Sequence, residues 1–436
     1  MSRVVITGYD CISPLGNTAA RSWANLLASK QCLTAVEDLP DYETRYKPYT
    51  KHLPPVLKVG KCPTPPVVDG LFSAQDKRRM SPMMMSTIST ALHALRRADL
   101  VGDAESPFTL TGVNPERVAT SIGTGLPAMN DIFDVSVDMA TRNKRPSPML
   151  IPKILTNMVA GAVSIKFNAR GPSQTTSTAC ATGNNAIIEG FNCVKSGMAD
   201  VAIVGATEES LHPLTIAGFH RLKSLSSDSK SRPFDNNRNG FVISEGTGVI
   251  ILESLEHATR RLGASTGHAS ILGELVGIGM SSDAYHITSP MENGDGAKRS
   301  MEMALRTAEV DASEVGYVNA HATSTPIGDM AELSGINDVF STKRSSPLYV
   351  SSSKGAMGHL LGASGLVESI FTLLSLKEGT IPHTLNLHDV IDMDPHSPVH
   401  LVKNEPVSDS TVKYAMTNSF GFGGVNTSLL FKKWEA

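Results

Sequence analysis

Short apolar runs alternate with helical repeats along most of the chain. Apolar residues recur at three- and four-residue spacing over residues 88–97, 186–196, 298–308, 329–340 and 364–376, which predicts helices. Between them, β-branched apolar runs predict buried strands at residues 4–8, 118–123, 201–205, 248–252, 315–320, 348–352 and 428–431. This alternation indicates an α/β fold in which helices cover the sheets.

Two polar stretches interrupt this pattern. Residues 38–68 are rich in proline and lysine and include Pro63-Thr64-Pro65-Pro66. Proline at this density blocks helices and sheet ladders, so we expect an excursion over the surface. Residues 223–239 form the second polar stretch. Neither has the composition of a free linker between independent domains.

The two halves of the chain show a weak internal repeat. Cys180 leads a small-residue helix that ends near Gly197, and His359 leads an apolar helix that ends near Gly379. Strand-rich sequence comes before each of them. Two similar halves that face each other would bring distant residues to one central site.

Composition narrows the range of partners. The 436 residues include 39 Lys and Arg against 42 Asp and Glu, and the net charge of −3 favours neither nucleic acid nor an anionic membrane. No apolar run reaches the roughly 18 residues of a membrane span. The strand at residues 4–8 leaves no room ahead of it for a removable presequence. The five cysteines lack metal-ligand spacing, so we expect free thiols, a reducing compartment and no metal.

Cys180 is the first candidate for chemistry. It lies in Ser177-Thr178-Ala179-Cys180-Ala181-Thr182-Gly183, just before a predicted helix. A tight turn there places the thiol at or near a helix N-terminus, where the dipole and the unpaired N–H groups favour the nucleophilic thiolate. If Cys180 is the nucleophile, the chain is a covalent catalyst.

Polar loops follow two of the predicted strands, at the ends where α/β proteins place functional groups. His321 follows strand 315–320 among short hydroxyl residues that suit a polar ligand, although a lone loop histidine is more often structural. Lys354 and His359 follow the strand at residue 348, separated by two glycines. Lys354 could equally be a solvated surface charge. His359 opens a helix, whose dipole favours a neutral imidazole that can donate to an oxyanion.

Two carboxylates begin the helix at residues 329–340. Asp329 is expected to cap its first turn. Glu332 is a candidate ion-pair partner for Lys354, or an exposed helical glutamate if Lys354 is exposed. Farther on, the glycine-rich stretch 418–426 carries Phe420 and Phe422, which suit a gate over an apolar channel. A hairpin with two core aromatic residues is as good an interpretation, and the Walker pattern is absent.

Together these segments resemble the β-ketoacyl-acyl carrier protein synthases, the condensing enzymes of fatty-acid synthesis. The resemblance spans nearly the whole chain and depends on four ordered motifs at residues 178–183, 321–329, 353–359 and 418–426. Residues 231–235 and 281–290 are similar to the elongating, cysteine–histidine–histidine branch. Residues 155–158 and 428–435 are similar to its fungal mitochondrial members.

The resemblance implies a thiolase-like α/β fold of two similar halves in a five-layered α-β-α-β-α arrangement. Residues 1–270 would form the half with the nucleophile, and residues 271–436 the half with the histidines and the lysine. It further implies a homodimer, no cofactor, and a mitochondrial location, with the cytoplasm as the alternative.

The implied reaction assigns a role to each motif. Cys180 would hold an acyl chain as a thioester, while malonyl-carrier loses carbon dioxide and the resulting carbanion attacks. His321 and His359 would stabilise the enolate. Lys354, with Glu332, would be structural and electrostatic. Further roles are implied for the backbone N–H groups of Cys180 and Phe422 as the oxyanion hole, for Phe422 and Phe420 as a gate, and for Thr323, Thr325 and Thr288 in binding pantetheine.

An acidic acyl carrier protein as partner implies a basic patch around the entrance. The chain has two clusters of Lys and Arg that could form this patch, although ordinary solvated surface is an equally good interpretation of them. The candidates for docking are Lys77, Arg78, Arg79, Arg142, Lys144 and Arg145.

Several other functions would use similar residues. A thiol-dependent acyl hydrolase would also pair Cys180 with a histidine, and a polyketide-type ketosynthase would share the whole set. A thiolase is less favoured because no second cysteine lies in a suitable C-terminal glycine loop. A non-catalytic chain-length factor would lack the nucleophile. The sequence leaves the preferred acyl chain length open.

Overall fold

One mixed sheet runs through the computed structural model, which describes residues 2–66, 68–102, 108–263, 270–341, 344 and 346–435. Its eleven strands lie in the order β12-β10-β9-β14-β15-β8-β1-β7-β6-β4-β5. In chain order the strands are β1 (Val4–Ile12), β4 (Val118–Gly123), β5 (Ser173–Gln174), β6 (Val201–Glu208), β7 (Gly246–Ser254), β8 (Gly273–Ser282), β9 (Val315–Asn319), β10 (Leu348–Ser351), β12 (Val399–Leu401), β14 (Tyr414–Gly421) and β15 (Val425–Lys432).

The sheet consists of the same five-strand pattern used twice. In β5-β4-β6-β7-β1 the first two pairs are parallel and the last two antiparallel, and β10-β9-β14-β15-β8 repeats this order of directions. A short antiparallel pairing between β1 and β8 joins the two patterns. The expected pair of similar α/β halves is confirmed, and the strand order supports the division that we propose at residue 270.

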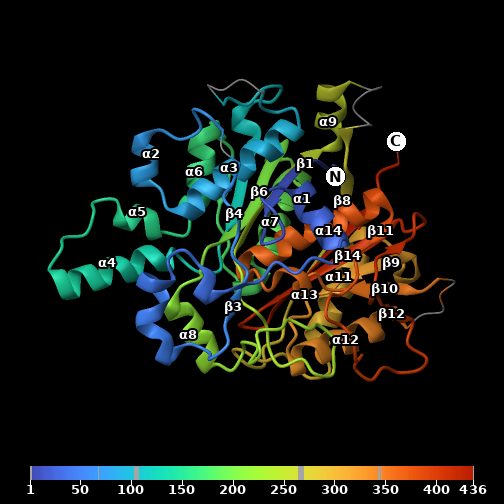
Figure 1. Cartoon of the computed structure of the whole chain (residues 1–436). Helices are drawn as coiled ribbons and strands as arrows, with labels where there is room; N and C mark the ends of the chain where they lie inside the picture. Colours follow the sequence, from blue (N-terminus) through green and yellow to red (C-terminus); the bar gives the residue numbers. More distant parts are fainter. Residues whose placement is uncertain are drawn as a thin grey trace.

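Two helices lie at the centre of the molecule. α7 (Thr182–Lys195) packs on β4 and β6, while α14 (Ser364–Glu378) packs on β14, on β7 and on α7. Thirteen of the fifteen residues of α14 are buried, because a sheet faces it on both sides. The outer layers are α3 (Pro82–Arg97) with α6 (Met158–Phe167), and α11 (Asp295–Ala308) with α12 (Pro326–Phe340) (Figure 1). The five-layered arrangement is therefore confirmed.

The remaining elements lie around these layers. None of the helices in the described part of the chain is both long and apolar enough to cross a membrane. The smaller helices are α1 (Ala19–Leu27), α2 (Ala74–Arg79), α4 (Met129–Arg142), α5 (Leu150–Ile154), α8 (Pro213–Arg221), α9 (Leu255–Leu262) and α13 (Lys354–Met357), and two further strand pairs are β2 (Thr34–Ala35) with β3 (Lys58–Val59) and β11 (Thr380–Ile381) with β13 (Val407–Ser408).

Residues 38–68, the segment expected to cross the surface, pack against the core. The segment forms short 3-10 and π turns and the strand β3, which pairs with β2 just before the segment. Its apolar side chains, such as Tyr46 and Val59, join a cluster that includes Ile216 and Phe241. The Tyr46 hydroxyl donates to the carbonyl of Leu211 at 2.9 Å. The excursion therefore covers the apolar wall next to α8.

All seven predicted strands and five predicted helices form, and the elements that the sequence did not predict include two long strands of the sheet, β8 and β14. β8 contains Gly277 and Gly279, where α11 lies so close that a Cβ at Gly279 would be 1.8 Å from the carbonyl oxygen of Ser300. These glycines allow the close approach. They also replace the apolar residues whose alternation with polar residues would predict a strand. Of the two interpretations of the stretch 418–426, the hairpin is confirmed, since Gly421 of β14 pairs with Val425 of β15. Phe422 at its tip is not a core residue, because it is exposed.

Gly8 is the equivalent close approach in the first half and gives a test of the packing. A Cβ at Gly8 would lie 2.1 Å from the carbonyl oxygen of Ala94 in α3. We expect Gly8→Ala to lower the free energy of unfolding by about 1–3 kcal/mol, because helix and strand must separate. The matched control is Gly102→Ala, where a Cβ meets nothing within 4 Å. Equal urea midpoints for the two variants would contradict this account.

Candidate active site

Cys180 lies in a tight turn at the start of α7, as predicted. The 3-10 turn Ala179–Ala181 leads directly into the helix, and Ala179 has a φ of 51°. The Thr182 hydroxyl bridges the turn, donating to the carbonyl of Ala179 at 2.7 Å and accepting from the N–H of Thr178 at 2.9 Å. Ser419 in β14 donates to the carbonyl of Cys180 at 2.8 Å. Both halves of the fold thus fix the turn.

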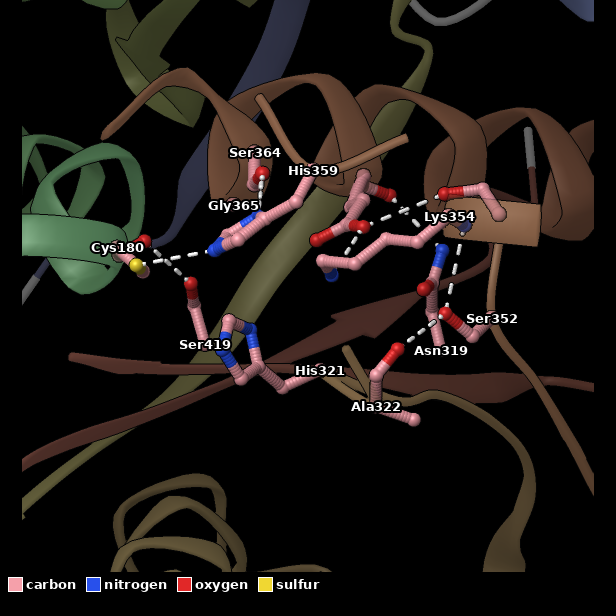
Figure 2. A network of polar contacts seen from close by, with 12 residues as sticks. Cys180, Asn319, His321, Ala322, Ser352, Lys354, His359, Ser364, Gly365 and Ser419 are labelled. Atoms are coloured by element: carbon pink, nitrogen blue, oxygen red, sulfur yellow. Dashed lines mark hydrogen bonds and ion pairs between the residues drawn. The ribbon is translucent and has the colours of Figure 1, made fainter. Parts of the chain in front are cut away.

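Two histidines face the thiol from the second half. His359 Nε2 lies 3.0 Å from Cys180 Sγ, and its Nδ1 lies 2.9 Å from the Ser364 hydroxyl (Figure 2). His321 follows β9, and its ring lies edge-on to that of His359 with the centroids 5.5 Å apart. The structure therefore brings together the three residues that the sequence placed 141 and 38 positions apart.

A neighbouring extended segment holds the backbone of His359. The N–H of His359 donates to the carbonyl of Val242, and its carbonyl accepts from the N–H of Ser244, at 2.8 and 2.9 Å. The Ser244 hydroxyl donates to the carbonyl of Met357 at 2.7 Å. Gly358 between them has a φ of 75°, and a Cβ there would lie 2.1 Å from the Ser244 oxygen. Only glycine fits this position.

Burial controls the protonation of the site. It lowers the pKa of His321 and of His359 well below the usual value, and the charge of Lys354 acts in the same direction. Both rings are therefore neutral, as expected for His359, although burial rather than the helix dipole is the main cause.

The thiol differs from the expectation. Burial raises the pKa of Cys180 to about 12, and the charge of Lys354 opposes this only in part. The helix N-terminus therefore does not offset the effect of burial on the thiol. A neutral thiol can instead donate to the neutral imidazole of His359.

Lys354 is fully buried, and its ion-pair partner is Glu368 rather than Glu332. The Lys354 Nζ lies 2.5 Å from Glu368 Oε1, and both side chains are 0% exposed. Glu332 is also buried, but it accepts from the backbone N–H groups of His321 and Ala322 at 2.9 and 2.7 Å. Glu332 thus holds the backbone of a histidine, and the predicted Lys354–Glu332 pair is wrong.

Sequence reasoning missed Glu368. It is the one charged residue in the first thirteen positions of α14, where its neighbours are apolar or small. An isolated charge in such a helix requires a partner when it is buried. That conflict was visible in the sequence and would have pointed to Lys354.

A cavity of about 360 Å³ opens onto Cys180, His321 and His359. Its other lining residues include the sequence candidates Thr288, Thr323, Thr325, Glu332, Phe420 and Phe422. Phe422 lies at the tip of the β14–β15 hairpin, where Gly423 and Gly424 have φ values of 89° and 75°. Its ring is 36% exposed and lies 6.5 Å from that of Phe219. An aromatic side chain on such a turn can cover or uncover the cavity.

The predicted basic clusters do not line this cavity. Lys77, Arg78 and Arg79 lie in α2, and Lys77 lines a separate cavity. Arg142 and Lys144 pair with Asp138 at the end of α4, at 3.0 and 2.7 Å. Their part in docking stays a prediction.

Among the described residues, no cluster of His, Cys, Asp and Glu is arranged to hold a metal ion.

The chain matches two adjacent family models. Residues 1–258 match the N-terminal domain of β-ketoacyl synthases, and residues 272–388 match their C-terminal domain. The chain belongs to the β-ketoacyl synthase family. A Saccharomyces cerevisiae protein named as a 3-oxoacyl-[acyl-carrier-protein] synthase homolog is 48% identical to this β-ketoacyl synthase, over 99% of each chain. A Vibrio harveyi 3-oxoacyl-[acyl-carrier-protein] synthase 2 is 38% identical, over 99% of this chain and 98% of its own.

Solved structures agree with this family. A β-ketoacyl synthase from Burkholderia phymatum superposes with a TM-score of 0.85 at 28% identity, and each chain is covered completely. A type II polyketide ketosynthase in complex with its acyl carrier protein superposes with a TM-score of 0.83 at 26% identity, over 99% of each chain. The predicted thiolase-like fold of this β-ketoacyl synthase is confirmed.

The raised pKa of Cys180 predicts a pH profile for its alkylation. Only the thiolate reacts with iodoacetamide. Because the pKa is raised to about 12, the thiolate fraction at pH 7 is small and should grow about tenfold per pH unit up to pH 9. Mass spectrometry of the Cys180 peptide measures the rate, and Cys180→Ala reports the reaction of the other cysteines. A plateau below pH 8 would contradict the burial argument.

Proposed function

We propose that this β-ketoacyl synthase catalyses decarboxylative condensation. An acyl chain held as a thioester on Cys180 is attacked by the carbanion that malonyl-acyl carrier protein forms on losing carbon dioxide, which yields 3-oxoacyl-carrier and frees the thiol. The single observation that carries the proposal is the approach of His359 Nε2 to within 3.0 Å of Cys180 Sγ, with a second neutral imidazole beside it. The names of the curated relatives support it.

In the acyl-transfer step, the thiol gives its proton to His359 as it attacks the acyl-carrier thioester. The Ser364 hydroxyl beside Nδ1 can accept or donate, so it supports either tautomer of the ring. The tetrahedral oxyanion is stabilised by the backbone N–H groups of Cys180 and Phe422. The departing carrier thiol recovers the proton, and the enzyme holds the acyl group.

In the condensation step, His321 and His359 donate N–H bonds to the carbonyl oxygen of the malonyl thioester. Negative charge grows on that oxygen as carbon dioxide leaves, and an oriented donor to such charge contributes about 3–4 kcal/mol. The Lys354–Glu368 pair lies behind the two rings. Burial lowers the pKa of both rings, and the Lys354 charge acts in the same direction, so both stay neutral. The carbanion then attacks the thioester carbon, and Cys180 leaves as the thiolate, which takes a proton from water to restore the thiol.

The residues that line the cavity suit the two parts of the substrate, the pantetheine arm and the acyl chain. Thr323, Thr325 and Thr288 supply hydroxyls for the amides of a pantetheine arm. Phe422, with Phe420 behind it on β14, gates the path to the acyl chain. A thiol hydrolase is less favoured, because a second imidazole and an aromatic gate serve carbanion formation and the exclusion of water.

The partner and the location extend this proposal. The second protein is an acidic acyl carrier protein, by analogy with the polyketide ketosynthase solved with its carrier. The enzyme acts as a homodimer in mitochondria. A Schizosaccharomyces pombe relative, 38% identical over the full length of both chains, carries the name of a proposed mitochondrial 3-oxoacyl-[acyl-carrier-protein] synthase.

Removing the thiol tests the reaction. Cys180→Ala should abolish formation of 3-oxoacyl-carrier from acyl- and malonyl-carrier, because no acyl-enzyme can form. Cys180→Gln should still release carbon dioxide from malonyl-carrier, because both histidines remain. Product mass spectrometry over a series of acyl primers reads both steps. Free acid without 3-oxoacyl product in the wild type would support a hydrolase, and a product extended several times would support a polyketide-type ketosynthase.

Charge reversal tests carrier docking by α2. Arg78→Glu combined with Arg79→Glu should raise the KM for malonyl-carrier at low salt, because an acidic carrier loses its attraction. The effect should weaken as ionic strength rises. Malonyl-pantetheine, which lacks the carrier protein, is the control and should show an unchanged KM. An unchanged KM for malonyl-carrier at low salt would reject docking at α2.

A further inference from the structure

Arg238 is a nearly buried cation directly behind the threonine-bearing wall of the cavity. Its side chain is 8% exposed. The guanidinium donates to the carbonyls of Thr325, Pro326 and Asp235, at 3.2, 2.7 and 2.9 Å. Two of these carbonyls belong to the turn that begins α12. The loop that starts at His321 ends at these two carbonyls. The planar guanidinium therefore connects the end of that loop to the polar segment around Asp235.

Asp329 completes this connection from the first turn of α12. It caps the helix as expected, since its carboxylate accepts from the N–H of Thr325 at 3.2 Å, but it is fully buried and also accepts from the N–H of Phe234 at 2.9 Å. It lies 3.8 Å from the Arg238 Nε. Burial raises the pKa of Asp329 to about 7, and Arg238 opposes that rise.

The loop between His321 and α12 has a conformation that its own residues do not favour. Ser324 has a φ of 68°, a region in which a serine is strained. The same polar segment holds it there, because the N–H of Gly240 donates to the Ser324 carbonyl at 2.8 Å and the N–H of Arg232 donates to its hydroxyl at 2.9 Å. The flanking hydroxyls of Thr323 and Thr325 then lie 3.1 Å apart, on the cavity wall.

We propose that Arg238 is a positioning residue for substrate binding. By fixing the carbonyls of Thr325 and Pro326, it holds the strained loop so that the Thr323 and Thr325 hydroxyls face the pantetheine arm. This rests on the proposed function, in which those hydroxyls bind that arm. Arg238 makes no contact with Cys180, His321 or His359 in the described structure, so it acts on the binding of the substrate rather than on the chemical step.

The experiment compares Arg238→Gln with a matched buried arginine. Arg261 is 7% exposed and pairs with Glu253 at 3.0 Å, far from the cavity in the layer that contains α9. Arg261→Gln therefore removes a similar buried cation without touching the loop. Arg238→Lys is the conservative variant, since an ammonium keeps the charge but cannot reach all three carbonyls. Thermal unfolding of each variant measures the loss of stability that comes from removing a buried arginine at either position.

Malonyl-pantetheine decarboxylation separates binding from chemistry. We expect Arg238→Gln to raise the KM for this substrate about tenfold with kcat within about twofold, the pattern of lost binding that is equal in the ground and transition states. Arg238→Lys should raise the KM less than Arg238→Gln does. Arg261→Gln should change neither constant, and the alkylation rate of Cys180 should be the same in all variants.

The possible failures are distinguishable. Wild-type enzyme that neither decarboxylates nor condenses would overturn the proposed function, and this inference with it. Active wild-type enzyme with an unchanged KM in Arg238→Gln would overturn the positioning role alone. A fall in kcat that Arg261→Gln shares would assign Arg238 to stability only. If Arg238→Gln does not fold, an unchanged KM in Arg238→Lys would overturn the positioning role in its place.

Discussion

Everything at this site depends on the direct contact between the N-terminal ends of two central helices. A Cβ at Gly183 in α7 would lie 2.5 Å from the backbone nitrogen of Leu366 in α14, and a Cβ at Gly365 would lie 2.6 Å from the Asn184 side chain. Because both helices begin with such small residues, their first turns touch. The residues just before them, Cys180 and His359, consequently meet at hydrogen-bond distance. Larger side chains at these glycines would separate thiol and imidazole.

The enclosure that this contact creates then determines the charges. A buried thiol loses its tendency to ionise and buried imidazoles lose their tendency to protonate, so Cys180, His321 and His359 are all neutral. A buried ion pair, Lys354 with Glu368, lies one step behind the histidines, and the carboxyl of Glu332 holds the backbone of His321. Such a pair is costly to bury, but it supplies a fixed positive charge that opposes protonation of both rings. Neutral rings can act as donors to a growing oxyanion and, at His359, as acceptor of the thiol proton.

Much of this could be predicted from sequence, and the failures share a physical cause. Cys180, His321, Lys354 and His359 were identifiable because each follows a strand or begins a helix, in a run of small residues. The predicted pairing of Lys354 was wrong because the sequence does not show which buried carboxylate lies beside it, and in the structure that carboxylate is Glu368 in α14 rather than Glu332 in α12. β8 and β14 were missed because close helix packing and polar contacts replace their apolar side chains. The thiolate was wrongly expected because a helix N-terminus is visible in sequence and desolvation is not.

The two halves are equivalent in topology but have diverged in chemistry. β4 in the first half corresponds to β9 in the second, and β6 corresponds to β14. After β9 comes His321, whereas after β4 comes Gly125, whose N–H donates to Glu208 at the end of β6. Glu208 also accepts from the N–H of Gly362 in the turn before α14. In the first half, therefore, the ends of β4 and β6 hold the helix junction in place, and Cys180 comes from the turn before α7. In the second half, His321 follows β9. A duplicated scaffold can in this way place different side chains at equivalent strand ends and bring both sets to one cavity.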